Sequence, residues 1–168
     1  MTVARDAFLG AMRRVASSVT IVTTDGDAGR HGATVSAFCS VSADPPSVLV
    51  CLKADSRIAR SVAENGSFCV NVLKDSAGDL ARRFATYGAN APVDRFAGVD
   101  VVTAPGRSAV LAAATSAFSC RLIELHAAGS HLIAIGQVDE VQVGAEPPLA
   151  YLDGRYACVS CDRPSTPT

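Results

Sequence analysis

Residues 32–42 read Gly-Ala-Thr-Val-Ser-Ala-Phe-Cys-Ser-Val-Ser, which is strand-like in composition yet carries four hydroxyl side chains. A β-branched run at 18–24 precedes it, and the Gly- and Asp-rich residues 25–32 separate the two. Two such runs joined by a turn cluster predict a β-hairpin. Because a proline pair at 45–46 ends the stretch and an apolar run at 47–52 follows, we expect a meander of three strands.

The rest of the chain continues mainly as strands with a few helices. Apolar spacing predicts an amphipathic helix over 4–16 that packs outside a sheet, and a helix capped by Asp55 or Ser56 that ends at Asn65-Gly66. The remaining elements expected are strands at 68–73, 115–125, 130–143 and 149–159, a helix at 76–85, and a long surface excursion at 86–110. Six or seven mostly adjacent strands with two or three helices predict a mainly β, antiparallel, closed or nearly closed barrel.

Composition narrows the class of protein. The 168 residues suit a single domain, and the formal net charge of −1 without any basic cluster beyond a pair argues against nucleic-acid binding. The longest apolar run, 48–52, is far shorter than the roughly 18 residues that a membrane helix needs. The first residues show no signal-peptide pattern, so we expect a cytoplasmic protein that does not bind membranes.

Familiar catalytic and metal-binding motifs do not occur in the sequence. Neither a GxSxG nor an HExxH pattern is found, and the three histidines are not spaced to share one strand face. The six cysteines fit reduced core residues of a cytoplasmic protein. Cys158 and Cys161 form a single CxxC without a second pair, so we expect no metal site, and the role of the pair stays open.

An anion site is indicated where the third strand meets the next helix. Lys53 and Ser56 lie at this junction, where unpaired helix N-terminal amides, a hydroxyl and a lysine converge. Phosphate is the natural ligand for such a group.

Six segments in order resemble one known family: GATVSAFCSVSADPPSVLVCL with the Ser-Arg pair that follows it, NGSFCVNVL, LARRFA, GSHLIAIGQV and YLDGRY. They are similar to the flavin reductase-like family, whose members have a flavin-binding Greek-key split β-barrel flanked by a few α-helices. Within it, the chain most resembles the reductase components of two-component flavin monooxygenases, such as that of 4-hydroxyphenylacetate 3-monooxygenase. The resemblance covers nearly the whole chain, so we expect a domain at 1–160 and a tail at 161–168.

The resemblance implies a homodimer in which NADH, with NADPH as the alternative, reduces FMN or FAD. The reduced flavin then leaves to serve a separate monooxygenase. It also implies site residues. The ring edge of the flavin would meet Thr34, Val35, Ser36 and Ala37, its ribityl or phosphate part Ser40, and its phosphate Lys53 and Ser56.

Further residues follow from the same resemblance. Arg83 and Phe84 would close over the flavin, Arg155 and Tyr156 would close the nicotinamide side, and His131 would position the nicotinamide as the catalytic residue. Ser130 stands where many relatives have an acidic residue, which leaves the orientation of the imidazole open.

Two other functions remain open at this point. One is a flavoprotein that keeps its flavin permanently and reduces another acceptor, such as a corrinoid. The other is a non-catalytic flavin-binding module, because a fold does not by itself fix a function. The preference between FMN and FAD, and the identity of the oxygenase, are not determined by the motifs.

Overall fold

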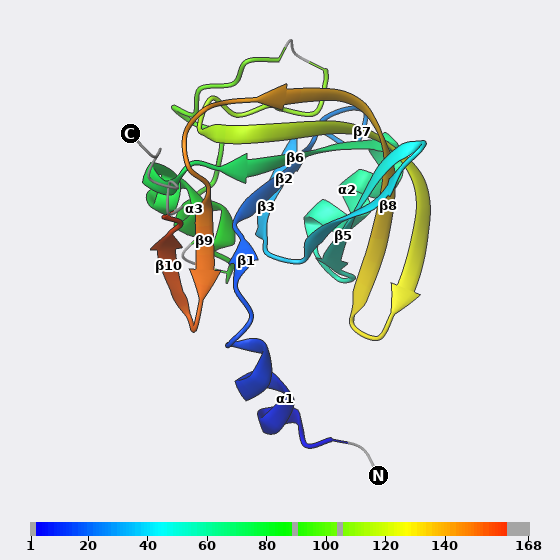
Figure 1. The fold of residues 1–168 in the computed structure, drawn as a ribbon. Helices are drawn as coiled ribbons and strands as arrows, with labels where there is room; N and C mark the ends of the chain where they lie inside the picture. Colours follow the sequence, from blue (N-terminus) through cyan, green and yellow to red (C-terminus); the bar gives the residue numbers. More distant parts are fainter. Residues whose placement is uncertain (1–2, 89–90, 104–105, 161–168) are drawn as a thin grey trace.

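A computed structural model describes residues 3–88, 91–103 and 106–160 as two antiparallel β-sheets with helices around them (Figure 1). The helices are α1 (Arg5–Met12), α2 (Arg57–Asn65), α3 (Gly78–Ala85) and a short 3₁₀-helix, η1 (Asp75–Ala77). The strands are β1 (Ser17–Ser18), β2 (Thr20–Thr24), β3 (His31–Val35), β4 (Phe38–Ala43), β5 (Pro46–Lys53), β6 (Ser67–Leu73), β7 (Ala114–Ala128), β8 (His131–Val143), β9 (Leu149–Leu152) and β10 (Arg155–Cys158). The predicted mainly β, antiparallel fold class is confirmed.

The hydroxyl-rich stretch is two strands instead of the single strand expected. The ladder breaks at Ser36 and Ala37, so that β3 pairs with β2 while β4 pairs with β5. The order of the larger sheet is β3-β2-β6-β7-β8-β5-β4, which places these two consecutive strands at opposite edges. The predicted three-stranded meander is therefore wrong, because the chain bends at the break and leaves one edge for the other.

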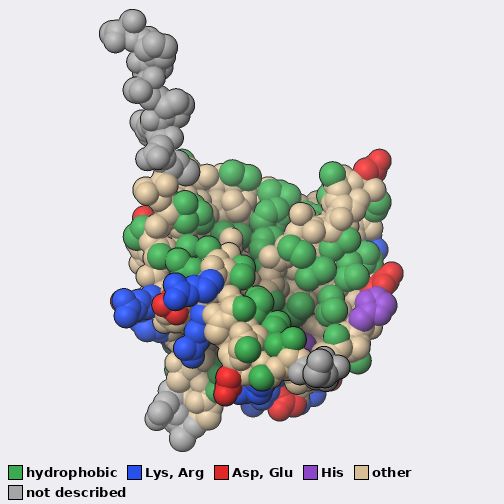
Figure 2. Space-filling model, turned by 60° about the horizontal axis from the view of Figure 1, so that its bottom comes forward, with side chains coloured by type: hydrophobic (Ala, Val, Ile, Leu, Met, Phe, Trp, Pro, Cys, Tyr) green, Lys and Arg blue, Asp and Glu red, His purple; other side chains and the backbone are tan. Residues whose placement is uncertain are grey.

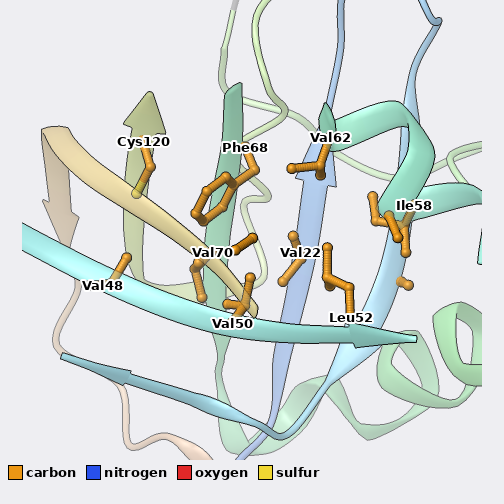
Figure 3. Packing of buried hydrophobic residues seen from close by; sticks show 12 residues of the cluster. Val22, Val48, Val50, Leu52, Ile58, Val62, Phe68, Val70 and Cys120 are labelled. Carbon is orange, nitrogen blue, oxygen red and sulfur yellow. The ribbon is translucent and has the colours of Figure 1, made fainter. Parts of the chain in front are cut away.

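The larger sheet curls around a shared core. Figure 3 shows side chains of β5, among them Val50 and Leu52, facing side chains of β2 and β6 such as Val22 and Val70. All of these are almost fully buried. A backbone hydrogen bond from Cys51 N–H to the Ala37 carbonyl, at 3.0 Å, joins the bend to β5. The curl thus brings the bend, the end of β5 and α2 close together.

Helix α2 forms as its flanking residues predict. The Ser56 hydroxyl caps its first turn by accepting from Ala59 N–H at 3.3 Å, and Gly66 ends it with a φ of 65°. That left-handed conformation suits glycine. The buried face of α2, which includes Ile58 and Val62, packs into the core (Figure 3). Its N-terminus therefore lies directly after the end of β5.

Helix α3 holds the excursion at 86–110 against β3. The Arg83 guanidinium donates to the carbonyls of Asp94 and Ala97, at 3.1 and 2.8 Å. The Phe84 and Phe96 rings pack edge to face with centroids 5.1 Å apart. The described part of the excursion is thus anchored by specific contacts and contributes to a second apolar cluster.

The last predicted strand is a hairpin. Asp153 and Gly154 both have positive φ, and they separate β9 from β10. These two strands and β1 form the smaller sheet, in the order β1-β9-β10. The predicted tail at 161–168, with Cys161, lies outside the described residues.

Helix α1 does not pack on a sheet as expected. None of its residues is buried, and Phe8 and Met12 are 57 and 48 % exposed. It projects from the body of the molecule (Figure 1), and a hydrogen bond from Asp153 N–H to the Arg13 carbonyl lies just after it. The expected helix forms, but its apolar side chains pack against none of the other described residues closely enough to be buried.

Candidate functional site

A cavity of about 510 Å³ lies at the bend between β3 and β4. We call it the strand cavity. Seven of the twelve site residues expected from the sequence line it: Thr34, Val35, Ser36, Ala37, Lys53, Ser56 and His131. Its other lining residues are Ala33, Cys51, Leu52, Ile58, Tyr87, Ala128 and Ile133. The curl of the sheet therefore gathers residues from β3, β5, α2, β7 and β8 at one place.

The bend supplies backbone groups that the sheet does not use. Ser36 and Ala37 are exposed, and their N–H groups donate to no acceptor within the described residues. Their carbonyls accept from Phe38 and Cys51 N–H, at 3.2 and 3.0 Å. Two adjacent amide donors are therefore available beside the cavity for acceptor atoms of a ligand.

The Thr34 hydroxyl has a structural partner. It donates to the Ala81 carbonyl of α3 at 2.7 Å and so ties that helix to β3. A contact from Thr34 to a ligand would therefore use its backbone, its methyl group or a lone pair of the hydroxyl.

Lys53 and Ser56 lie at the end of the cavity that the N-terminus of α2 forms. The Ser56 hydroxyl donates to the Lys53 carbonyl at 2.5 Å, and the Lys53 ammonium pairs with Asp55 at 3.1 Å. Both side chains of that ion pair are more than half exposed, so the pair holds Lys53 weakly. The ammonium is thus free to turn towards an anion bound at the helix N-terminus.

His131 begins β8 directly opposite Lys53 in the ladder. Its Nδ1 lies 2.9 Å from the Ser130 hydroxyl, and the ring is exposed. Ser130 can therefore orient the imidazole through this hydrogen bond.

A second cavity of about 630 Å³ adjoins the strand cavity. We call it the arginine cleft. The two share Ala33, Lys53, Ser56, Ile58 and Tyr87. The cleft continues past Ser56 between α2, the start of β3 and the excursion, and is lined further by Arg30, His31, Gly32, Asp55, Arg57, Gly88, Ala91, Pro92, Val93, Asp94, Arg95 and Phe96.

Burial and nearby positive charge both lower the pKa of His31. Burial lowers the pKa of this imidazole below its usual 6.5, and the nearby guanidinium groups of Arg57 and Arg95 lower it further. A hydrogen bond with the Ala28 backbone and the charge of Asp25 oppose them only in part. His31 is therefore mainly neutral at pH 7, and the positive charge of the cleft comes from its arginines and lysine.

Comparisons with known proteins identify the family. The model of the flavin reductase like domain matches residues 12–160. The chain belongs to the flavin reductase-like family. It is 37 % identical over 159 residues to the FMN reductase (NADH) RutF of Ancylobacter novellus, a match that covers 94 % of this chain and 87 % of RutF.

Solved structures of this family have the same fold. The Streptomyces globisporus NADH:FAD oxidoreductase SgcE6, in complex with NAD and FAD fragments, superimposes with a TM-score of 0.86 at 28 % identity and 94 % coverage of both chains. BorF is the flavin reductase component of a bacterial two-component tryptophan halogenase. It superimposes with a TM-score of 0.83 at 30 % identity, over 95 % of this chain and all of BorF.

Five residues expected from the family resemblance lie outside both cavities. Ser40 is exposed on β4, opposite Val48. Arg83 anchors the excursion, and Phe84 is fully buried. Arg155 and Tyr156 belong to the smaller sheet, where the Arg82 guanidinium lies 5.5 Å from the centre of the Tyr156 ring. A flavin or nicotinamide contact by any of these five stays a prediction.

Apart from Lys53 and Ser56, the residues of the arginine cleft are not among the site residues expected from the sequence. Arg30 and His31 were placed in a turn, and Arg57 was noted only as part of a Ser-Arg pair. Tyr87 and Arg95 lie in the excursion, whose length was the one signal for a functional role. These residues come from three distant segments, so no spacing along the chain relates them.

Proposed function

We propose that this protein is an NADH-dependent flavin reductase that reduces FMN or FAD and releases the reduced flavin to a separate monooxygenase. The observation that carries the proposal is the strand cavity, where two free backbone amides, a helix N-terminus with Lys53, and His131 converge. Membership of the flavin reductase-like family supports the same reaction.

The donors of the strand cavity fit a flavin. Its isoalloxazine edge presents acceptor atoms, which match the amides of Ser36 and Ala37, and its phosphate matches the Lys53 and Ser56 junction. The volume of about 510 Å³ is in the range of ligand sites, which is roughly 300–1,000 Å³. When bound, a flavin accepts a hydride from the nicotinamide, and the two cofactors carry that chemistry.

The chain contributes orientation and electrostatics. The Ser36 and Ala37 amides are fixed by the bend, so they can stabilise negative charge at the ring edge without rearranging. His131, held by Ser130, would position the nicotinamide at the same cavity. Lys53 is largely exposed, so its contact with a phosphate would be weak, which suits a flavin that must dissociate.

NADH oxidation by dialysed protein tests the proposal. NADH absorbance is followed in air with no flavin, with FMN and with FAD, and then with NADPH in place of NADH. Oxidation that appears only with added flavin and saturates with its concentration is the expected result. Bound flavin that survives dialysis, or flavin that binds without any NADH oxidation, would contradict the proposal and favour the permanent flavoprotein or the binding module.

The expected homodimer also belongs to this proposal. Large apolar side chains are exposed on and beside α1, and others are exposed on β9: Val3, Phe8, Leu9, Met12, Val15, Tyr151 and Leu152. Figure 2 looks onto the end of the molecule where α1 lies, and hydrophobic side chains cover much of that face. A second copy of the chain would bury this surface.

The location in the cell stays a prediction. Among the described residues, no helix is long and apolar enough to cross a membrane. We propose the cytoplasm, where the sequence placed the protein.

A further inference from the structure

The arginine cleft carries more positive charge than the first phosphate of a flavin requires. Its lining has four cationic side chains against two carboxylates: Arg30, Lys53, Arg57, Arg95, Asp55 and Asp94. Both carboxylates already have partners. Asp55 pairs with Lys53, and Asp94 accepts from Phe96 N–H at 2.8 Å. The four cationic side chains exceed the two carboxylates by two positive charges.

Two of these arginines contact no polar group among the residues that the structure describes. The Arg95 guanidinium donates to the carbonyls of Gly32 and Thr86, and thereby fixes the excursion to β3. In the described part of the chain, Arg30 and Arg57 form no side-chain hydrogen bond and no ion pair. The Arg30 guanidinium lies 4.6 Å from the centre of the Phe96 ring, which positions it at the cleft. Planar guanidinium groups with free donors are well suited to phosphate.

The cleft also offers an aromatic surface. Tyr87 lines both cavities and stays 60 % exposed, with the Arg95 guanidinium 5.2 Å from its ring centre. Exposed aromatic rings stack with nucleobases, so Tyr87 offers a surface on which a base can stack. A base and a second phosphate are thus the groups that the cleft matches.

The position of the cleft indicates which ligand would supply these groups. It begins at Lys53 and Ser56, where the proposed function puts the first flavin phosphate, and it leads away from the strand cavity. We propose that the arginine cleft binds the adenosine phosphate half of FAD, so that the protein prefers FAD to FMN. This inference rests on the proposed function, because it takes the flavin ring to lie in the strand cavity.

Steady-state kinetics with both flavins test the inference. For the unmodified protein, we expect a KM for FAD about tenfold below that for FMN, since FAD adds one charged and one stacking contact. In Arg30→Gln, the KM for FAD should rise about tenfold and that for FMN by less than about twofold, because FMN does not reach Arg30. Equal KM values for the two flavins, or an equal rise of both in Arg30→Gln, would overturn it.

Arg60→Gln is the matched control. Arg60 is also an exposed arginine, it lies on α2 three residues after Arg57, and it lines neither cavity. It donates to the Asp55 carbonyl at 3.1 Å. Its substitution removes the same charge near the same helix end, so it should leave the ratio of the two KM values unchanged. A change in that ratio as large as in Arg30→Gln would mean that general charge, and not the cleft, sets the preference.

Inhibition by ADP distinguishes the two cofactors that contain this group. We expect ADP to compete with FAD and to lose potency in Arg30→Gln, whereas competition with NADH alone would assign the cleft to the nicotinamide cofactor and overturn the inference. If neither flavin supports NADH oxidation, the proposed function fails by itself. Calorimetric titration with FAD and FMN then tests the inference. Tighter binding of FAD than of FMN, with the difference lost in Arg30→Gln, would uphold it. Equal binding of the two flavins would overturn it.

Discussion

At the scale of single residues, the pKa of His31 depends on the charge of the arginine cleft. Its pKa is lowered by burial and then by Arg57 and Arg95, so a histidine NMR titration should place it below 6.5. In Arg57→Gln, the same titration should move upward, because one of the charges that disfavours the imidazolium is gone. A pKa of 6.5 or higher in the unmodified protein would contradict this reading of the cleft.

The same group links stability to pH. A histidine whose pKa is lower in the folded state binds fewer protons there than in the unfolded chain. Its contribution to stability is therefore present above the unfolded value of 6.5 and declines as the pH falls through that value towards the folded pKa. Denaturant unfolding of the unmodified protein and of His31→Gln at several pH values should show a smaller loss of stability on acidification in the variant.

Ser56 has two roles that a suitable substitution separates. Ser56→Ala would remove the proposed phosphate contact, but it would also cost about 1 kcal/mol by removing the cap of α2. Ser56→Asp keeps an acceptor for the Ala59 N–H and adds a negative charge, but it loses the donor to the Lys53 carbonyl. The KM for FMN should rise about tenfold, with a smaller loss of stability than in Ser56→Ala because the cap is kept. Riboflavin, which lacks the phosphate, is the control, and an equal rise in its KM would contradict the phosphate assignment.

At the scale of elements, local signals predicted α2 well and the hydroxyl-rich strand badly. Ser56 and Gly66 bound the helix through hydrogen bonds and a φ that depend on neighbouring residues only. The break at Ser36 and Ala37 has no comparable local cause, because both residues fit a continuous strand. It follows from the two different partners of β3 and β4, because β2 and β5 are separated in the sheet by β6, β7 and β8.

The close packing of Phe68 against β8 depends on the absence of a side chain at Gly136. A Cβ at this position would lie 2.6 Å from Cζ of Phe68, which is fully buried. Gly136→Ala should therefore lower the free energy of unfolding by about 1–3 kcal/mol, as other overpacked cores do. Gly10→Ala is the control, since an added Cβ there meets nothing within 4 Å, and denaturant unfolding of both variants provides the measurement.

At the scale of the whole molecule, α1 exposes apolar side chains that the proposed homodimer would cover. We expect the protein to sediment as a dimer and Phe8→Glu to shift it towards the monomer, because a charge would enter the apolar interface. Gly10→Glu is the control, as helical periodicity places Gly10 on the opposite side of α1. A monomer at all concentrations, or equal dissociation of both variants, would contradict the proposed role of α1.

The strand periodicity, the caps of α2 and the family motifs at residues 34–37, Lys53, Ser56 and His131 can be recognised in the sequence. They depend on neighbouring residues, so a linear pattern records them. The division of the hydroxyl-rich stretch between two sheet edges, and the meeting of Arg30, Tyr87 and Arg95 in one cleft, become visible only in the folded chain. Contacts between distant segments are set by how the sheet curls and packs, and a single sequence contains no spacing that encodes them.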